Sequence, residues 1–246
     1  MKTFKTTLLA LTLTLVFAPL VQSCLHDNDD YYLAIATFRT TKDNDYYFTL
    51  DNGETMYAQQ PTHSKLEDGQ RVYVYFDILD EKVSGYDYNI EVEGIVKILT
   101  KDVIAMDETT ADSIGDDKVN ITALWFGDGY LNVKFQFEGT RNPTDLHMVN
   151  LVRNDIEGAN DNEEAGYIGL EFRHNAFDDY EAEVLNGIVS FKGPFTEKEM
   201  KGLKIRYRSI YDGVKYIKID FKEDEKPTAG FFFSGSNMAN VGSTVQ

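Results

Sequence analysis

The stretch Arg71-Val-Tyr-Val-Tyr-Phe-Asp-Ile-Leu79 alternates apolar and other side chains with a period of two. Because successive side chains of a β-strand point to opposite faces, four apolar residues share one face. They are Val72, Val74, Phe76 and Ile78. Residues 86–99, YDYNIEVEGIVKIL, repeat the alternation. We therefore predict two half-buried strands here and β-structure in the sequence around them.

Upstream, the segments YYLAIATFRT (residues 31–40) and YYFTL (residues 46–50) also read as strands. Asn52-Gly53 is typical of a type I′ hairpin turn, and Asp68-Gly69 marks a second turn. Four or five strands in about 75 residues suit a small closed barrel, and the five-stranded OB fold is one such barrel. The sequence thus predicts an OB-like β-barrel over residues 31–108.

The segment DETTADSIGDD from Asp107 has no apolar period, which indicates a linker over residues 109–118. Alternation resumes in LNVKFQFEG (residues 131–139), and seven or so short strands predict an antiparallel β-sandwich over residues 119–235. A capping-box pattern favours one short helix over residues 196–201. The polar tail, residues 236–246, is expected to be flexible. The predicted fold class is all-β.

The N-terminus has the features of a signal peptide over residues 1–23: basic Lys2 and Lys5, an apolar core, and a small residue before Cys24. The apolar run is too short to favour a membrane-spanning helix. Val21-Gln22-Ser23-Cys24 resembles the bacterial lipobox, which implies that Cys24 is lipidated. Two or more acyl chains anchor a protein stably, so we expect a lipid anchor in the outer membrane.

Residues 24–30 form an acidic tether after the expected cleavage site. Its residues Asp27, Asp29 and Asp30 resemble the export signal of surface lipoproteins in the Bacteroidetes, which would place the protein on the cell surface. The same residues also suit an extended spacer, since like charges repel. The periplasmic face of the outer membrane therefore stays open as an alternative location.

The formal net charge of −17 argues against nucleic acid as a partner, since phosphates are repelled. Residues 31–108 carry 15 acidic and 7 basic side chains, which argues against oligonucleotide binding by the barrel. A cationic partner or a neutral glycan is compatible with the charge. The aromatic content of 13% suits β-sheet packing and also suits a sugar-binding platform. The sequence leaves the oligomeric state open.

Several ordered motifs carry a family resemblance over nearly the whole mature chain: FTLDNGETMYA, DGQRVYVYFDIL, SGYDYNIEVEGIVKILTK, WFGDGYLNVKFQF, LVRN and LEFRHN. Together they resemble the NigD-like lipoproteins of Bacteroidetes. The resemblance implies an N-terminal OB-like domain and a C-terminal β-sandwich. The family is named after a bacteriocin gene cluster, which implies at most a link to bacteriocin production or immunity.

LEFRHN (residues 170–175) and LVRN (residues 151–154) hold the sharpest polar cluster. One hypothesis is that Arg153, Arg173 and His174 line a ligand-binding site, for instance for an anion held by guanidinium groups. The alternative is that they pair with carboxylates across strands. On a strand, His174 shares the face of Phe172, and Arg173 points the other way.

No pattern favours catalysis. The four histidines have no metal-site spacing, FFFSGS around Ser234 is not a nucleophile elbow, and no HExxH occurs. We expect no cofactor, no metal site and no enzymatic activity. The predicted function is a surface lipoprotein that binds an unknown protein or glycan partner without catalysis. The alternatives are a carbohydrate-active or hydrolytic accessory with a site on the sandwich, and bacteriocin immunity.

Overall fold

The structure is a computed structural model that describes residues 31–42, 45–58, 65–141, 146–158, 162, 164–180, 183–193, 195, 199–221 and 233–234. The expected signal peptide, the tether with Cys24, Asp27, Asp29 and Asp30, and the tail lie outside the described residues. Residues 196–198 of the helix expected over residues 196–201 lie outside the described residues too. The other half of that prediction is wrong, because residues 199–201 are not helical and Glu199 has φ 78° in a turn. No helix of the described part is long and apolar enough to cross a membrane.

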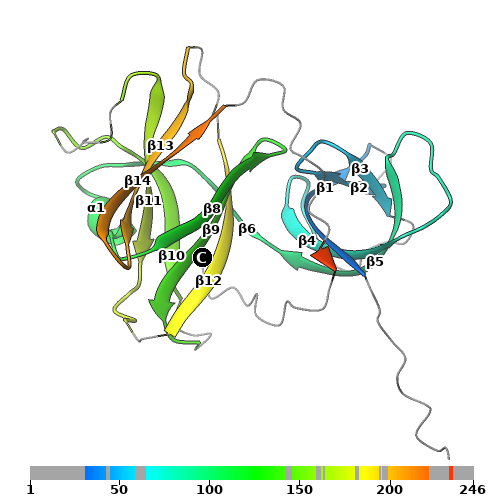
Figure 1. Cartoon of the computed structure of the whole chain (residues 1–246), viewed down its shortest axis with the longest axis horizontal. Helices are drawn as coiled ribbons and strands as arrows, with labels where there is room; N and C mark the ends of the chain where they lie inside the picture. Colours follow the sequence, from blue (N-terminus) through cyan, green and yellow to red (C-terminus); the bar gives the residue numbers. More distant parts are fainter. Residues whose placement is uncertain are drawn as a thin grey trace, which may run out of the picture. The chain divides into compact units, whose positions relative to one another are not determined.

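The N-terminal domain is a closed barrel of five strands (Figure 1). They are β1 (Tyr32–Thr40), β2 (Tyr46–Leu50), β3 (Thr55–Ala58), β4 (Arg71–Ile78) and β5 (Tyr88–Lys97). The strand order is β1-β2-β3-β5-β4, and β4 pairs with β1 to close the barrel. Only the β3–β5 pair is parallel. The predicted OB-like barrel is confirmed.

The barrel interior is built by the predicted alternation. Val72, Val74 and Phe76 are fully buried in its core, whereas Ile78 at the end of β4 is exposed. A register shift between β4 and β5 places a β-bulge beside Phe76. Bulges bend a strand, and Ile78 lies beyond the bulge, at the end of β4, where it still pairs with Ile90.

The β2–β3 turn differs from the type I′ turn predicted for Asn52-Gly53. Gly53 has φ +83°, whereas Asn52 is not among the positive-φ residues of the described chain. The Gly53 amide donates to the Leu50 carbonyl (2.9 Å), and the Asn52 Oδ1 accepts from the Glu54 amide (3.0 Å). The side-chain bond holds Asn52 in an ordinary turn conformation, and glycine alone takes the left-handed one.

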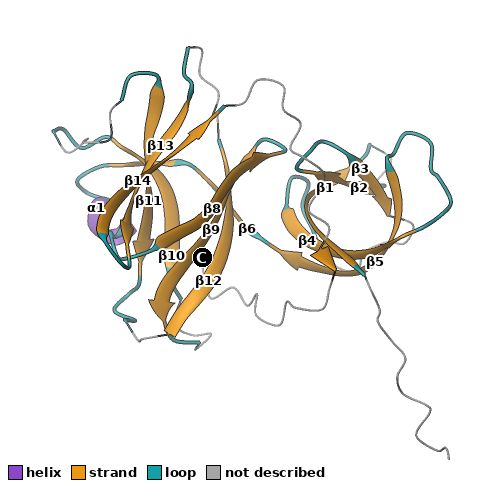
Figure 2. Cartoon of the chain, in the orientation of Figure 1, coloured by secondary structure: helices purple, strands orange, loops and turns teal. Residues whose placement is uncertain are grey.

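The C-terminal domain is a sandwich of two sheets (Figure 2). One has the order β14-β13-β11-β10-β7 and the other β6-β12-β9-β8. Their strands are β6 (Leu99–Asp102), β7 (Ile104–Met106), β8 (Asn120–Gly127), β9 (Tyr130–Gly139), β10 (Met148–Asn154), β11 (Tyr167–Asn175), β12 (Glu183–Lys192), β13 (Gly202–Ser209) and β14 (Gly213–Asp220). Buried aromatic residues from both sheets fill the space between them, including Phe135, Phe137, Phe172 and Phe191.

The predicted sandwich is confirmed, but its sheets are mixed rather than purely antiparallel. β7 pairs with β10, β11 with β13 and β6 with β12 in parallel. Parallel neighbours are joined by long connections. Alternation within a strand does not reveal its direction, so the sequence pattern could not indicate these pairs.

The domain boundary lies earlier than predicted. Residues 99–106, expected in the barrel, form β6 and β7 of the sandwich. Residues 109–118, expected as a linker, include the short helix α1 (Ala111–Ile114), whose Ile114 is buried against Met106 and Val152. β15 (Phe233–Ser234), expected in the sandwich, pairs with β1 of the barrel. The alternation simply continues past β5 without a glycine or proline to mark the change of domain.

The described residues of the barrel and the sandwich belong to one compact unit, and Arg71 joins the two domains. The Arg71 side chain, 0% exposed, leaves the outer face of β4. Its guanidinium donates to Thr37 Oγ1 (3.0 Å) and Asp51 Oδ1 (2.5 Å) in the barrel, and to Asn132 Oδ1 (3.1 Å) in the sandwich. Ser190 of β12 donates to the same Asn132 oxygen (2.7 Å).

Besides Arg71, Asp51 accepts a hydrogen bond from the sandwich, donated by Trp125 Nε1 (2.7 Å). A Cβ on Gly127 would overlap the Asp51 carboxylate, so glycine permits this close approach. The Tyr130 ring lies 5.3 Å from the Arg71 guanidinium, and its hydroxyl donates to the Gly69 carbonyl (2.7 Å). The joint is therefore formed mainly by residues of the quoted sequence motifs.

Apolar contacts surround this polar joint. Tyr73 on the outer face of β4 packs with Leu33, Ile98 and Ile188, and Trp125 lies against this cluster. Burial raises the pKa of Tyr73 to about 12. Both faces of β4 are thus covered, which explains why a strand predicted as half-buried has buried residues at successive positions 71–74.

We expect Arg71→Ala to lower the free energy of unfolding by about 3–5 kcal/mol, because it leaves Asp51 without its cation in a largely buried setting. Urea denaturation measures the change. Arg153→Ala is the matched control: Arg153 pairs with Asp155 at the surface, where such a pair contributes about 0–1 kcal/mol. Equal losses in the two variants would contradict a structural role for the joint.

Candidate functional site

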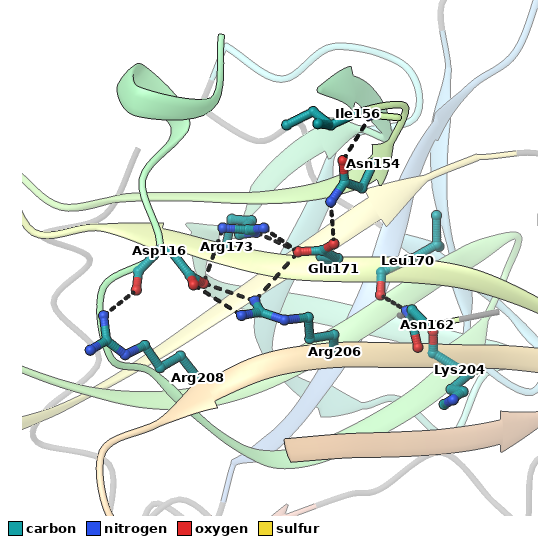
Figure 3. Close-up of polar contacts among 10 residues, drawn as sticks. All are labelled: Asp116, Asn154, Ile156, Asn162, Leu170, Glu171, Arg173, Lys204, Arg206 and Arg208. Atoms are coloured by element: carbon teal, nitrogen blue, oxygen red, sulfur yellow. Dashed lines mark hydrogen bonds and ion pairs between the residues drawn. The ribbon is translucent and has the colours of Figure 1, made fainter. Parts of the chain in front are cut away.

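The outer face of the β11–β13 pair carries a network of charged side chains (Figure 3). Glu171, whose side chain is 2% exposed, accepts from Arg173 Nε (2.6 Å) and from Arg206 Nη1 (3.4 Å). Asp116 forms a bidentate pair with Arg206 (2.9 and 3.0 Å) and an ion pair with Arg173 (3.2 Å). Each of these two arginines thus lies between the same two carboxylates.

Neighbouring residues complete the network. Asn154 Nδ2 donates to Glu171 Oε1 (2.7 Å), and Asn154 Oδ1 accepts from the Ile156 amide (3.1 Å). Arg208 Nη1 donates to the backbone carbonyl of Asp116 (3.2 Å). Figure 3 shows the side chains of Arg173 and Arg206 directed toward Asp116 and Glu171. Register explains the arrangement, because Glu171 and Arg206 are partners in the parallel β11–β13 pair.

The three residues singled out in the sequence do not come together. Arg173 belongs to the charged network, but Arg153 forms an exposed pair with Asp155 through Nε (2.8 Å) and Nη2 (2.9 Å). His174 is buried inside the sandwich beside Phe137. The strand geometry predicted this separation of Arg173 from His174, since adjacent residues point to opposite faces.

His174 forms a buried pair with His147, a residue that the sequence analysis did not single out. The rings stack with centroids 5.1 Å apart, and His174 Nε2 lies 2.9 Å from His147 Nδ1. His174 Nδ1 lies 2.9 Å from the Lys118 carbonyl, and His147 Nε2 lies 3.1 Å from Asp179 Oδ2. The two histidines are far apart in sequence, so no local spacing could have revealed the pair.

The acceptors that flank the histidine pair, the Lys118 carbonyl and the Asp179 carboxylate, indicate where the ring protons lie. A carbonyl can only accept, so His174 carries its proton on Nδ1 and accepts from His147 at Nε2. With its Nδ1 toward His174, His147 presents its other ring nitrogen, Nε2, to the Asp179 carboxylate. Burial, together with the charge of His147, lowers the pKa of His174 to about 4.

Asp179 lies near the end of a loop over residues 175–180 that is held by several hydrogen bonds. Its Oδ2 accepts from the amide and hydroxyl of Thr140 (2.7 and 3.0 Å) as well as facing His147. Two non-glycine residues of the loop, Phe177 (φ 47°) and Asp178 (φ 68°), take the left-handed backbone conformation. Such conformations cost about 1–3 kcal/mol each and persist where surrounding contacts impose them.

The arrangement favours structural bonding over ligand chemistry at the predicted residues. The guanidinium of Arg173 already faces two carboxylates, and His174 is buried and neutral near pH 7. Among the described residues, no group of three or more His, Cys, Asp or Glu side chains is placed to hold a metal ion. The loop at 175–180 is the feature that local sequence reasoning missed, since NAFDDY contains no glycine to indicate a left-handed turn.

Comparison with known proteins identifies the family. The profile of the NigD-like N-terminal OB domain matches residues 35–98, and that of the NigD-like C-terminal β-sandwich domain matches residues 102–221. The chain belongs to the NigD-like family. No curated protein matches it.

Solved structures share the fold of this NigD-like chain. A protein of unknown function from Bacteroides vulgatus is 28% identical, with a TM-score of 0.67 over 82% of this chain and 95% of its own. A putative toxin-related protein from Parabacteroides distasonis is 32% identical, with a TM-score of 0.63 over 79% and 95%. A NigD-like immunity protein from Bacteroides caccae is 20% identical, with a TM-score of 0.55 over 82% and 97%.

We expect the ring of His174 to titrate with a midpoint near pH 4 in the folded protein. The unfolded value is about 6.5, so stability from the neutral ring is present above pH 6.5 and is lost as the pH falls toward 4. The NMR resonance of the His174 Cε1 proton measures the midpoint, with the chain in urea as reference. A folded-state midpoint at the reference value would contradict the buried neutral ring.

Proposed function

We propose that this NigD-like chain is a lipid-anchored outer-membrane protein that displays a rigid two-domain body for binding a partner without catalysis. The observation that carries the proposal is the internal pairing of Arg173 with Glu171 and Asp116. The most chemically suggestive side chain of the sequence thus holds the sheet together. Loops and sheet faces are then the surfaces left for recognition.

The lipobox-like sequence before Cys24 supports the anchor, and the joint at Arg71 supports display as a single body. A tether of seven residues, 24–30, would separate this body from the membrane. The acidic residues of the tether support export to the cell surface. The net charge of −17 favours neutral or cationic partners.

A carbohydrate-active or hydrolytic accessory is the alternative on the same sandwich. It would require a substrate to compete with the carboxylates that already bind Arg173 and Arg206. Removing one partner from a buried charged group is costly, about 3–5 kcal/mol. The charged network therefore supports the binding module over this alternative.

Protease shaving of intact cells tests the location. We expect the natural protein to be cut and the variant with Asp27, Asp29 and Asp30 replaced by Ala to be protected, because the acidic residues direct export. A variant with Asp77, Asp80 and Glu81 replaced by Ala is the control, since it changes the charge equally in the barrel. If the natural protein resists proteolysis until the outer membrane is breached, the surface location is wrong.

Bacteriocin immunity is a second candidate, supported by the family name and by the name of the related protein from Bacteroides caccae. Immunity proteins protect the cell that makes the toxin. Deleting the gene should therefore sensitise the producing strain, as measured by growth inhibition in the presence of its own secreted bacteriocin. Unchanged sensitivity would reject immunity and leave the anchored binding module in place.

A further inference from the structure

The loop at residues 175–180 presents two aromatic rings to solvent. Phe177 is 55% exposed and Tyr180 is 64% exposed. Large apolar side chains at the surface mark interaction sites when they are held together in one place. Both rings belong to one short loop of the sandwich.

The backbone that carries these rings is fixed from several sides. Asp117 Oδ2 accepts from the Ala176 amide (2.9 Å), Asn175 Oδ1 accepts from the Phe177 amide (2.9 Å), and Asp179 is bonded to Thr140. A partner would therefore meet a loop backbone that is already ordered. Binding to a pre-ordered surface loses less conformational entropy, which favours affinity.

Carboxylates lie close to the exposed Tyr180. Its hydroxyl contacts Asp178 Oδ1 (3.4 Å), and the charge of Asp117, with a contribution from Asp178, raises the pKa of the phenol. Asp117 also accepts the hydrogen bond from the Ala176 amide of the loop. The Tyr180 side chain thus sits in a negative local potential, which complements a cation.

Elsewhere on the sandwich, tyrosine rings make cation–π contacts with lysines. The Tyr167 hydroxyl donates to Asp220 (2.8 Å), and the Lys218 ammonium lies 4.9 Å from the Tyr167 ring centroid. The ammonium of Lys204 lies 4.8 Å from the Tyr216 ring centroid. On this sandwich, tyrosine rings on the β11 and β14 strands are covered by lysines of the same chain.

Tyr180 resembles Tyr167, because the hydroxyl of each lies beside a carboxylate. The two tyrosines differ in their cation–π contacts. In the described part of the chain, the cation–π contacts involve Trp125, Tyr130, Tyr167 and Tyr216 and not the rings of the loop. We infer that the loop at 175–180 is a docking site for lysine or arginine side chains of a cationic partner protein. This inference deepens the proposed binding function and rests on it.

A fluorescein-labelled peptide of five alternating lysine and glycine pairs, (Lys-Gly)5, tests the site with the purified mature chain. Fluorescence anisotropy at 150 mM NaCl, which screens long-range attraction, measures the dissociation constant. The double variant Phe177→Leu/Tyr180→Leu keeps apolar surface and removes both rings. We expect it to bind the peptide about three- to thirtyfold more weakly, the range for one or more cation–π contacts.

Matched controls separate a local site from the general charge of the chain. Tyr216→Leu removes a ring that already faces Lys204, and it should leave binding unchanged. Asp178→Asn should weaken binding, whereas Asp80→Asn in the barrel changes the net charge equally and should have less than a twofold effect. Circular dichroism of each variant checks that the fold is kept.

Two results would overturn the inference. Equal weakening by the loop and control variants would mean that the peptide responds to net charge, with no docking site at 175–180. Binding of uncharged maltohexaose in place of the peptide, lost in the same double variant, would make the occupant a sugar. Both outcomes are independent of the shaving experiment, which tests the anchored location of the whole protein.

Discussion

The buried guanidinium of Arg71 is the constraint on which the rest of the structure depends. A charge removed from water must be matched by oriented partners, and Arg71 finds them in both domains, at Asp51 in the barrel and at Asn132 in the sandwich. Glycine at position 127 follows from the same requirement, because a side chain there would overlap Asp51. Two small β-domains, each with its own core, thereby become one body.

Much of the fold could be predicted from side-chain alternation, because burial on one face of a sheet leaves a period of two in the sequence. The interior positions of β4 and the inward direction of Phe172 and His174 followed from it. The alternation did not predict the direction of the strands, the change of domain at residue 99 or the return of β15 to the barrel. These features depend on long-range pairing, which leaves no local mark.

The candidate site shows the same division. The pattern LEFRHN correctly drew attention to a polar cluster, but only the register of β11 with β13 brings Arg206 beside Glu171. The pairing of His174 with His147, and of Asp179 with Thr140, needs the packed sandwich. The left-handed backbone at Phe177 and Asp178 is imposed by those contacts rather than by the residue types. The surface that the loop at 175–180 presents is therefore a product of tertiary structure.

Equilibrium unfolding of the natural protein in urea tests most directly whether the joint unites the domains. The single tryptophan, Trp125, donates to Asp51 and reports on the joint through its fluorescence, whereas far-UV circular dichroism reports on the strands of both domains. A rigid joint predicts one transition with the same midpoint by both probes. Two steps in circular dichroism, with Trp125 following only one of them, would contradict it.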